Sequence, residues 1–186
     1  GADTPLQDAQ RAVRLVRSRA ARDGIDPDRV SVMGFSAGGH VAGSLATRFG
    51  VNAYAPIDAA DAQSARPSLA ALMYPVITMR EPHAHSVSRL ILMVRPPPAS
   101  LVAPYSLHSP PPADTPPTFL MHAADDPSVP VENTLAMFAA LKRAGVAAEM
   151  HVFERGGHGF GLRGLEDNAA RAWPQLFLDW ARMRGF

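Results

Sequence analysis

The 186-residue chain contains no cysteine, which excludes disulfide bonds, thiolate catalysis and cysteine-based metal sites. It also lacks any hydrophobic run near the roughly 18 residues that a membrane-spanning helix needs. The net charge of +1 gives no reason to expect nucleic acid or a membrane surface as a partner. No signal peptide is visible, but the chain starts at Gly1 rather than methionine, so the sequence leaves the cellular compartment open.

The remaining composition, with 47% hydrophobic residues, is typical of one globular domain spanning residues 1–186. Apolar patterns predict strands and helices in alternation, and this order favours a mostly parallel sheet with helices on both faces. The predicted strands are 29–35 (buried), 69–77, 118–122 and 148–153, and the predicted helices are 4–23, 36–48, 132–144 and 174–183.

Local signals set the expected helix ends and faces. Thr4 is expected to cap the first helix, with Gln7 completing a capping box and Asp23-Gly24 ending it. The arginines of this helix are interpreted as a solvated face rather than a nucleic-acid patch. Two inward faces are predicted: Leu135, Phe138, Ala139 and the Lys142 stem in helix 132–144, and Leu176, Phe177 and Trp180 in helix 174–183.

Residues 78–117 lack the hydrophobic periodicity of the rest of the chain, because proline clusters interrupt it. This irregular, proline-rich excursion is predicted to hold little more than a helical turn near 100–105. Its apolar stretch 90–94 is expected to cover a pocket or to lie beneath the excursion. A proline-rich ligand for a partner domain is the weaker alternative.

Residues 34–39, Gly-Phe-Ser-Ala-Gly-Gly, lie between a predicted strand and a predicted helix. A serine nucleophile needs such a sharp turn to expose its hydroxyl, and Gly34 and Gly38 are expected to let the strand and the helix approach. Serine alone is a weak nucleophile, so a histidine base and an orienting acid are required.

Two loops after later strands supply these groups. Asp126, next to Asp125, follows strand 118–122, and His158 follows strand 148–153 among several glycines. Polar residues at the carboxyl ends of parallel strands gather at one edge of the sheet. The chain order Ser36, Asp126, His158 is the order found in α/β-hydrolases. The alternative interpretation makes Asp126 a helix cap and His158 a plain surface residue.

These segments resemble the α/β-hydrolase esterases, close to the acetylxylan esterases and the BD-FAE-like (bifunctional feruloyl/acetyl esterase) branch. The resemblance covers nearly the whole chain but is weak across 86–112, and it corresponds to the C-terminal two thirds of such an enzyme. In the family the acid shortly precedes a Val-Pro pair, so the resemblance implies Asp126 over Asp125. The matching stretches are 34–40 (Gly-Phe-Ser-Ala-Gly-Gly-His), 122–133 (His-Ala-Ala-Asp-Asp-Pro-Ser-Val-Pro-Val-Glu-Asn) and 156–161 (Gly-Gly-His-Gly-Phe-Gly).

The resemblance implies a serine esterase that cleaves short-chain, acetyl-type esters, for instance of plant polysaccharide, through an acyl-enzyme and without a cofactor. Ser36 would attack, His158 would transfer the proton and Asp126 would orient His158. A serine peptidase of the prolyl-oligopeptidase type and a catalytically weak or inactive hydrolase fragment are the alternatives. The His83 and His85 pair with Glu81 is a weak metal pattern, and no metal is predicted.

The resemblance also implies an upstream part of the family's site that this sequence does not contain. The backbone N–H of Ala37 is one expected oxyanion donor, whereas the family's second donor comes from an upstream His-Gly-Gly loop that does not occur before Ser36. Losing one such donor costs about 3 kcal/mol. The strand before Ser36 would also have an open edge, so we expect a second copy or a companion N-terminal fragment to pair with it.

Overall fold

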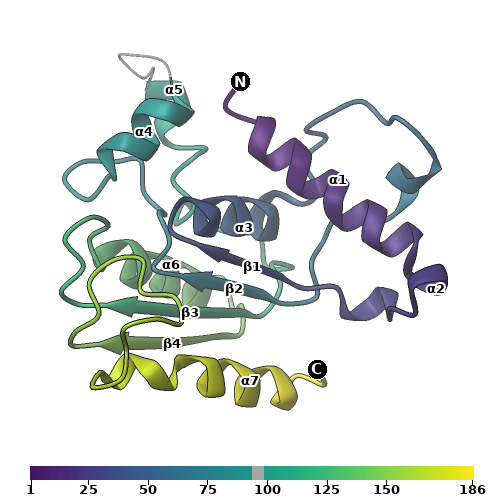
Figure 1. Ribbon diagram of the computed structural model, residues 1–186. Helices are drawn as coiled ribbons and strands as arrows, with labels where there is room; N and C mark the ends of the chain where they lie inside the picture. Colours follow the sequence, from purple (N-terminus) through teal and green to yellow (C-terminus); the bar gives the residue numbers. More distant parts are fainter. Residues whose placement is uncertain (94–98) are drawn as a thin grey trace.

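The computed structural model describes residues 1–93 and 99–186, which form an α/β structure around a four-stranded sheet (Figure 1). Neighbouring strands are parallel throughout, as the alternation of strands and helices predicts. The strands follow chain order across the sheet: β1 (Val32–Phe35), β2 (Ala70–Met73), β3 (Thr118–Ala123) and β4 (Ala148–Phe153).

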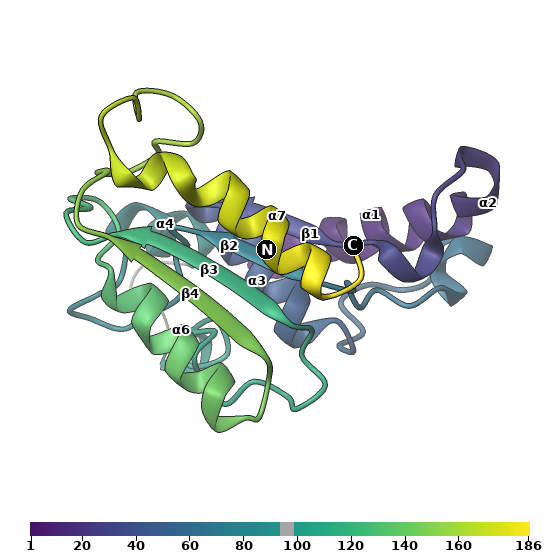
Figure 2. The ribbon, with the colours of Figure 1, turned by 90° about the horizontal axis from the view of Figure 1, so that it is seen from below.

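Helices cover both faces of this sheet. One face carries α3 (Ala37–Arg48) and α6 (Glu132–Arg143), and the opposite face carries α7 (Trp173–Met183), as Figure 2 shows from below. The first helix, α1 (Thr4–Ser18), packs beside α3 and continues into the short α2 (Ala20–Asp23). Gly24 ends α2 in the left-handed conformation, as predicted from the sequence.

The two-residue period of the central strands divides the core into two clusters. Odd-numbered residues of β2 and β3, such as Met73 and Phe119, pack with Trp173 and Trp180 of α7. Even-numbered residues, such as Leu72 and Leu120, pack with α3 and α6 instead. Every residue of both strands is buried, so helices cover the center of the sheet on both faces.

The predicted cap of the first helix is wrong by one residue. Asp3 is the N-cap and Thr4 is the first helical residue, but no side chain caps the helix. The Asp3 carboxylate instead receives hydrogen bonds from Arg48 and Tyr105, and the Gln7 amide donates to the Ala53 carbonyl. Tertiary contacts have therefore replaced the local capping box.

The predicted strand 29–35 is too long and is not buried. Pro27–Arg29 forms a 3₁₀ turn, and β1 starts only at Val32. Met33 and Phe35 are 39% and 37% exposed. Among the described residues β1 pairs with β2 alone, so it is an edge strand, and the side chains on its α7-facing side are only partly covered.

The predicted strand 69–77 is also shorter than expected, because it ends where Tyr74 takes a positive φ of 35°. In the excursion after it, the structure adds a helix that the sequence did not predict, α4 (Ser86–Leu92), and places the predicted turn at α5 (Ala99–Val102). The prolines 96–98 and Val94 lie outside the described residues. Minor 3₁₀ segments occur at Ala59–Ala62 and Ala169–Ala172.

The inward face predicted for helix α7 is confirmed, whereas that of α6 is only partly right. Phe138 of α6 packs against the core, as predicted. Leu135 is 43% exposed, and the buried stripe contains the polar residues Asn133 and Thr134. Both can be buried because they hydrogen-bond to neighbouring elements, so hydrophobicity alone predicted only part of the buried stripe. Leu176, Phe177 and Trp180 of α7 do pack against the sheet.

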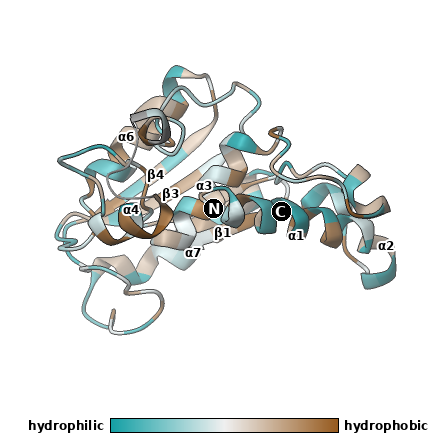
Figure 3. Ribbon diagram, turned by 90° about the horizontal axis from the view of Figure 1, so that it is seen from above, coloured by the Kyte–Doolittle hydropathy of each residue, from teal (hydrophilic) through white to brown (hydrophobic). Residues whose placement is uncertain are grey.

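Figure 3 shows hydrophobic residues, in brown, along the strands and in α4. Ile91 and Val87 of α4 are exposed, while Leu92 is partly buried near Met79 and Met93. No helix in the described parts of the chain is long and apolar enough to cross a membrane.

Candidate active site

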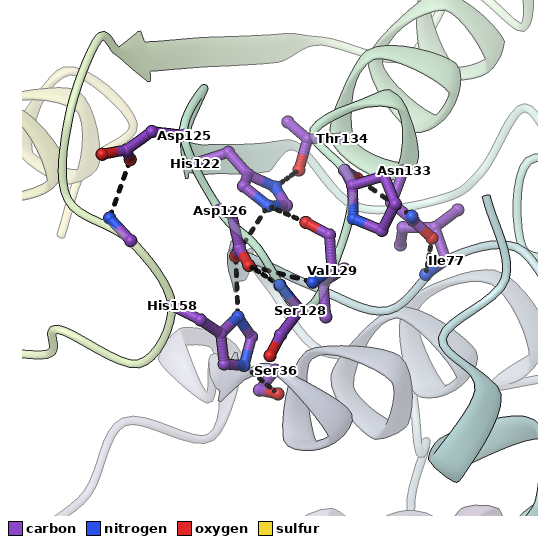
Figure 4. Close-up of polar contacts among 12 residues, drawn as sticks. Ser36, Ile77, His122, Asp125, Asp126, Ser128, Val129, Asn133, Thr134 and His158 are labelled. Carbon is purple, nitrogen blue, oxygen red and sulfur yellow. Dashed lines mark hydrogen bonds and ion pairs between the residues drawn. The ribbon is translucent and has the colours of Figure 1, made fainter.

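Polar side chains follow the carboxyl end of every strand. Ser36 comes after β1, Tyr74 after β2, Asp126 after β3 and His158 after β4. Since all the strands are parallel, these four positions meet at one edge of the sheet. Figure 4 shows Ser36, Asp126 and His158 converging there.

Ser36 occupies a strained turn between β1 and α3, with φ 53° and ψ −120°. Few residues other than glycine adopt a positive φ, so the surrounding contacts must hold it. Its backbone N–H donates to the Met73 carbonyl, and its own carbonyl accepts from the Val76 N–H. These bonds tie the turn to the end of β2.

Gly34 and Gly39 are the glycines that make this turn sterically feasible. A Cβ at Gly34 would collide with the Gly38 carbonyl, and a Cβ at Gly39 would come 2.7 Å from the Cβ of Pro75. A Cβ at Gly38 would meet open space. The prediction for Gly34 therefore agrees with the structure, whereas the close approach predicted for Gly38 belongs to Gly39.

Ser36, His158 and Asp126 form a continuous chain of hydrogen bonds. The Ser36 Oγ lies 2.8 Å from Nε2 of His158, and Nδ1 of the same ring lies 2.7 Å from Oδ2 of Asp126. An ionised carboxylate can only accept, so Nδ1 carries the ring proton and Nε2 accepts from the serine hydroxyl. The ring of His158 is 22% exposed, while the Asp126 carboxylate is fully buried.

The two adjacent aspartates have different partners. Asp126 receives the backbone N–H groups of Ser128 and Val129 on Oδ1, at 2.8 and 2.9 Å. Asp125 receives the backbone N–H of Gly157 at 2.8 Å, which fixes the loop that carries His158. Thus one carboxylate contacts the histidine ring and its neighbour contacts the backbone beside that ring.

Ala37, the predicted oxyanion donor, is the first residue of α3. Its N–H therefore has no acceptor one turn earlier in the helix, and it lies at the positive end of the helix dipole. A pocket of about 410 Å³ borders it. Its mainly apolar lining comes from the starts of α1 and α3 and from α4, and includes Pro5, Ala37, His40, Val41, Met79, Ile91 and Leu92.

Tyr74 is a neighbour of the site that the sequence did not predict. Its ring centroid lies 5.3 Å from that of His158 in an edge-on arrangement, and its hydroxyl accepts from the Gly161 N–H. Burial raises the pKa of the Tyr74 phenol, which therefore stays neutral at pH 7. Nothing in the local pattern distinguished this tyrosine from an ordinary strand residue.

The remaining histidines lie outside the Ser36–His158 contact. His122 reaches Asp126 from the α6 side, whereas His40 is buried in α3 and contacts the Val76 carbonyl. His85 caps α4, and Glu81 pairs with Arg89. Within residues 1–93 and 99–186, no three histidines or carboxylates are grouped closely enough to hold a metal ion.

The sheet order and the strand–serine–helix turn define the class of protein. A family model described as alpha/beta hydrolase fold matches residues 2–162, and the chain belongs to this family.

Individual relatives carry more specific names. Over 156 residues the chain is 41% identical to endo-1,4-beta-xylanase B of Butyrivibrio fibrisolvens. This match covers 83% of this chain and 24% of that protein. It is 32% identical over 162 residues to an acetylxylan esterase of Xylanibacter ruminicola, covering 85% of this chain and 31% of that one.

A solved structure is similar over nearly the full length of this chain. It is an acetyl ester-xyloside bifunctional hydrolase from Caldicellulosiruptor lactoaceticus, with a TM-score of 0.90 and 42% identity. The match covers 97% of this chain and 66% of that one. The chain thus spans about a quarter to a third of these curated relatives and about two thirds of the solved one.

Proposed function

We propose that this chain carries the nucleophile, base and acid of a serine esterase that cleaves short-chain, acetyl-type esters. The observation that carries the proposal is the unbroken hydrogen-bond chain from Ser36 through His158 to the buried Asp126. The names of the relatives, an acetylxylan esterase and an acetyl ester-xyloside hydrolase, support acetylated plant polysaccharide as the source of the ester.

Acylation begins when His158 Nε2 takes the proton of the Ser36 hydroxyl as Oγ bonds to the ester carbonyl carbon. Asp126 stabilises the imidazolium that forms, and it keeps the ring in the orientation required for the transfer. The tetrahedral intermediate then collapses: the bond to the alcohol breaks, and the alcohol oxygen leaves with the proton from His158. An acyl group remains on Ser36.

In this proposal the Ala37 N–H donates to the negative oxygen of the intermediate; its position at the start of the helix directly after Ser36 supports this role. Deacylation repeats the same proton transfers, with water in place of the alcohol. His158 takes a proton from water as the oxygen bonds to the acyl carbon, and then returns the proton to the Ser36 oxygen as the acid departs. No cofactor enters any of these steps.

Hydrolysis of p-nitrophenyl acetate and labelling by a fluorophosphonate test this proposal together. We expect both on wild-type protein, and we expect Ser36→Ala to lower acetate hydrolysis by at least a thousandfold and to abolish labelling. Ser31→Ala, in the segment before the same strand, is the matched control and should leave both unchanged. Full activity in Ser36→Ala would overturn the assignment.

The same assays separate the two alternatives. A peptidase of the prolyl-oligopeptidase type would cleave proline anilides in preference to acetate esters. A weak or inactive hydrolase would leave ester turnover near background, and fluorophosphonate labelling would then report whether the nucleophile is still activated. Release of acetate from acetylated xylan, measured alongside, tests the proposed substrate class.

A further inference from the structure

His122 connects the Asp126 carboxylate to helix α6. It belongs to β3, and its fully buried side chain faces α6 together with the other even-numbered residues of that strand. Its Nε2 lies 3.2 Å from Asp126 Oδ2 and 3.0 Å from the Val129 carbonyl oxygen. On the opposite side of the ring, Nδ1 lies 2.7 Å from the Thr134 hydroxyl (Figure 4).

These partners determine which ring nitrogen carries the proton. Both groups facing Nε2 are acceptors, so Nε2 must be the protonated nitrogen. Nδ1 is then an acceptor and receives the hydrogen bond of the Thr134 hydroxyl, which can serve as a donor. Burial lowers the pKa of His122, which agrees with a neutral ring in this single tautomer at pH 7.

We propose that His122 is a positioning residue for the acid of the site: its Nε2–H holds Oδ2 of Asp126 in place, and Thr134 holds His122. This inference rests on the proposed function. It extends the hydrogen-bonded chain by two members, from Thr134 through His122, Asp126 and His158 to Ser36.

The chemistry of the site favours a neutral donor here. Asp126 stabilises an imidazolium at His158 only while the carboxylate keeps its full negative charge. An arginine or lysine at this position would orient the carboxylate but would also offset its charge. A neutral imidazole fixes Oδ2 without doing so, and the backbone N–H groups of Ser128 and Val129 fix Oδ1 in the same way.

Two variants at position 122 separate the hydrogen bond from simple packing. His122→Phe keeps a ring but loses the donor, and we expect kcat to fall about tenfold to a hundredfold with KM changed less than twofold. His122→Gln places an amide N–H near the position of Nε2, and it should recover most of the loss. A His122→Phe enzyme that folds and keeps wild-type kcat would overturn the proposal, as would His122→Gln no better than His122→Phe.

Position 134 supplies a second test that leaves the histidine intact. Thr134→Val removes the hydroxyl at nearly constant volume and should lower kcat by a smaller factor, whereas Thr134→Ser should behave like wild type. His151→Gln is the matched control, because His151 also bonds a carboxylate, Glu149 at 2.8 Å, but far from Ser36 on a partly exposed part of β4. It should change neither kcat nor KM.

A spectroscopic measurement tests the inference even if the esterase assay fails. Nitrogen-15 NMR of the wild-type protein at pH 7 should show His122 as the neutral ring with its proton on Nε2. A proton on Nδ1, or a charged ring, would overturn the positioning role. Because this result needs only the folded protein, it can fail while the proposed function stands, and it can succeed while the proposed function falls.

Discussion

His40 illustrates how much a single buried side chain can depend on pH. It is 6% exposed on α3, and its Nδ1 contacts the Val76 carbonyl oxygen at 3.2 Å. In the described structure its buried Nε2 has no hydrogen-bond partner. Burial lowers the pKa of His40 from 6.5 to about 4, so the folded protein keeps this ring neutral.

We expect this histidine to destabilise the fold in acid. Between pH 6.5 and 4 the unfolded chain binds a proton at position 40 that the folded chain does not, so the free energy of unfolding falls as the pH drops. This decrease in the free energy of unfolding approaches about 3 kcal/mol at pH 4. Urea denaturation at a series of pH values measures it.

Substitution at the same position isolates this contribution. His40→Asn can keep a donor toward the Val76 carbonyl but cannot titrate, and it should flatten the decline between pH 6.5 and 4 relative to wild type. His122 contributes in the same direction, which is why the difference between the two proteins is the informative quantity. His151→Gln, at a partly exposed position, is the control; parallel wild-type and His40→Asn curves would contradict the argument.

At the scale of elements, the joint between β1 and α3 decides where Ser36, the proposed nucleophile, lies. The strand and the helix touch backbone to backbone, since the α-hydrogen of Gly34 faces the Gly38 carbonyl. The opposite side of the joint packs against Pro75, directly after the backbone turn at Tyr74. Close approach of β1, α3 and the end of β2 therefore fixes Ser36.

A matched pair of glycine substitutions tests this account of the joint. Gly34→Ala should lower the free energy of unfolding by about 3 kcal/mol, because its Cβ collides with a backbone atom. Gly38→Ala meets no neighbour and gains helix propensity, so it should be neutral or stabilising by up to about 1 kcal/mol. Equal effects in the two variants, measured by urea denaturation, would show that the contact does not matter.

At the scale of the whole molecule, β1 leaves one edge of the described sheet unpaired. The Val32 and Ser36 N–H groups donate to β2, so the alternate N–H groups of Met33 and Phe35 point to the other side. Both side chains are also partly exposed. An open, apolar strand edge of this kind favours pairing with another strand.

We therefore expect the 19.9 kDa chain to associate in solution, as measured by size-exclusion chromatography with light scattering. Met33→Pro removes an outward N–H without touching the bonds to β2, and it should weaken association. Met33→Ala keeps that N–H and should associate more strongly than Met33→Pro. A wild-type protein that stays monomeric at about 20 kDa would contradict the prediction.

Much of this arrangement was predictable because its signals are local. Strand and helix types follow from the spacing of apolar residues, and the turn at Ser36 follows from its glycines between a strand and a helix. The helix ends and faces that failed depend on partners distant in the chain. Asp3 bonds to Arg48 instead of capping α1, and Asn133 is buried because it accepts from the Ile77 and Thr78 N–H groups.

The sequence by itself determined the parallel α/β fold and the serine, histidine and aspartate that we propose as nucleophile, base and acid, since the type and order of these residues are properties of the chain. Only the tertiary structure decided the environment around them. Tyr74 stands beside His158, and Thr134 fixes the tautomer of the histidine that holds Asp126. The physical reason is that burial and hydrogen-bond direction arise when separate elements pack together, and no local pattern encodes that packing.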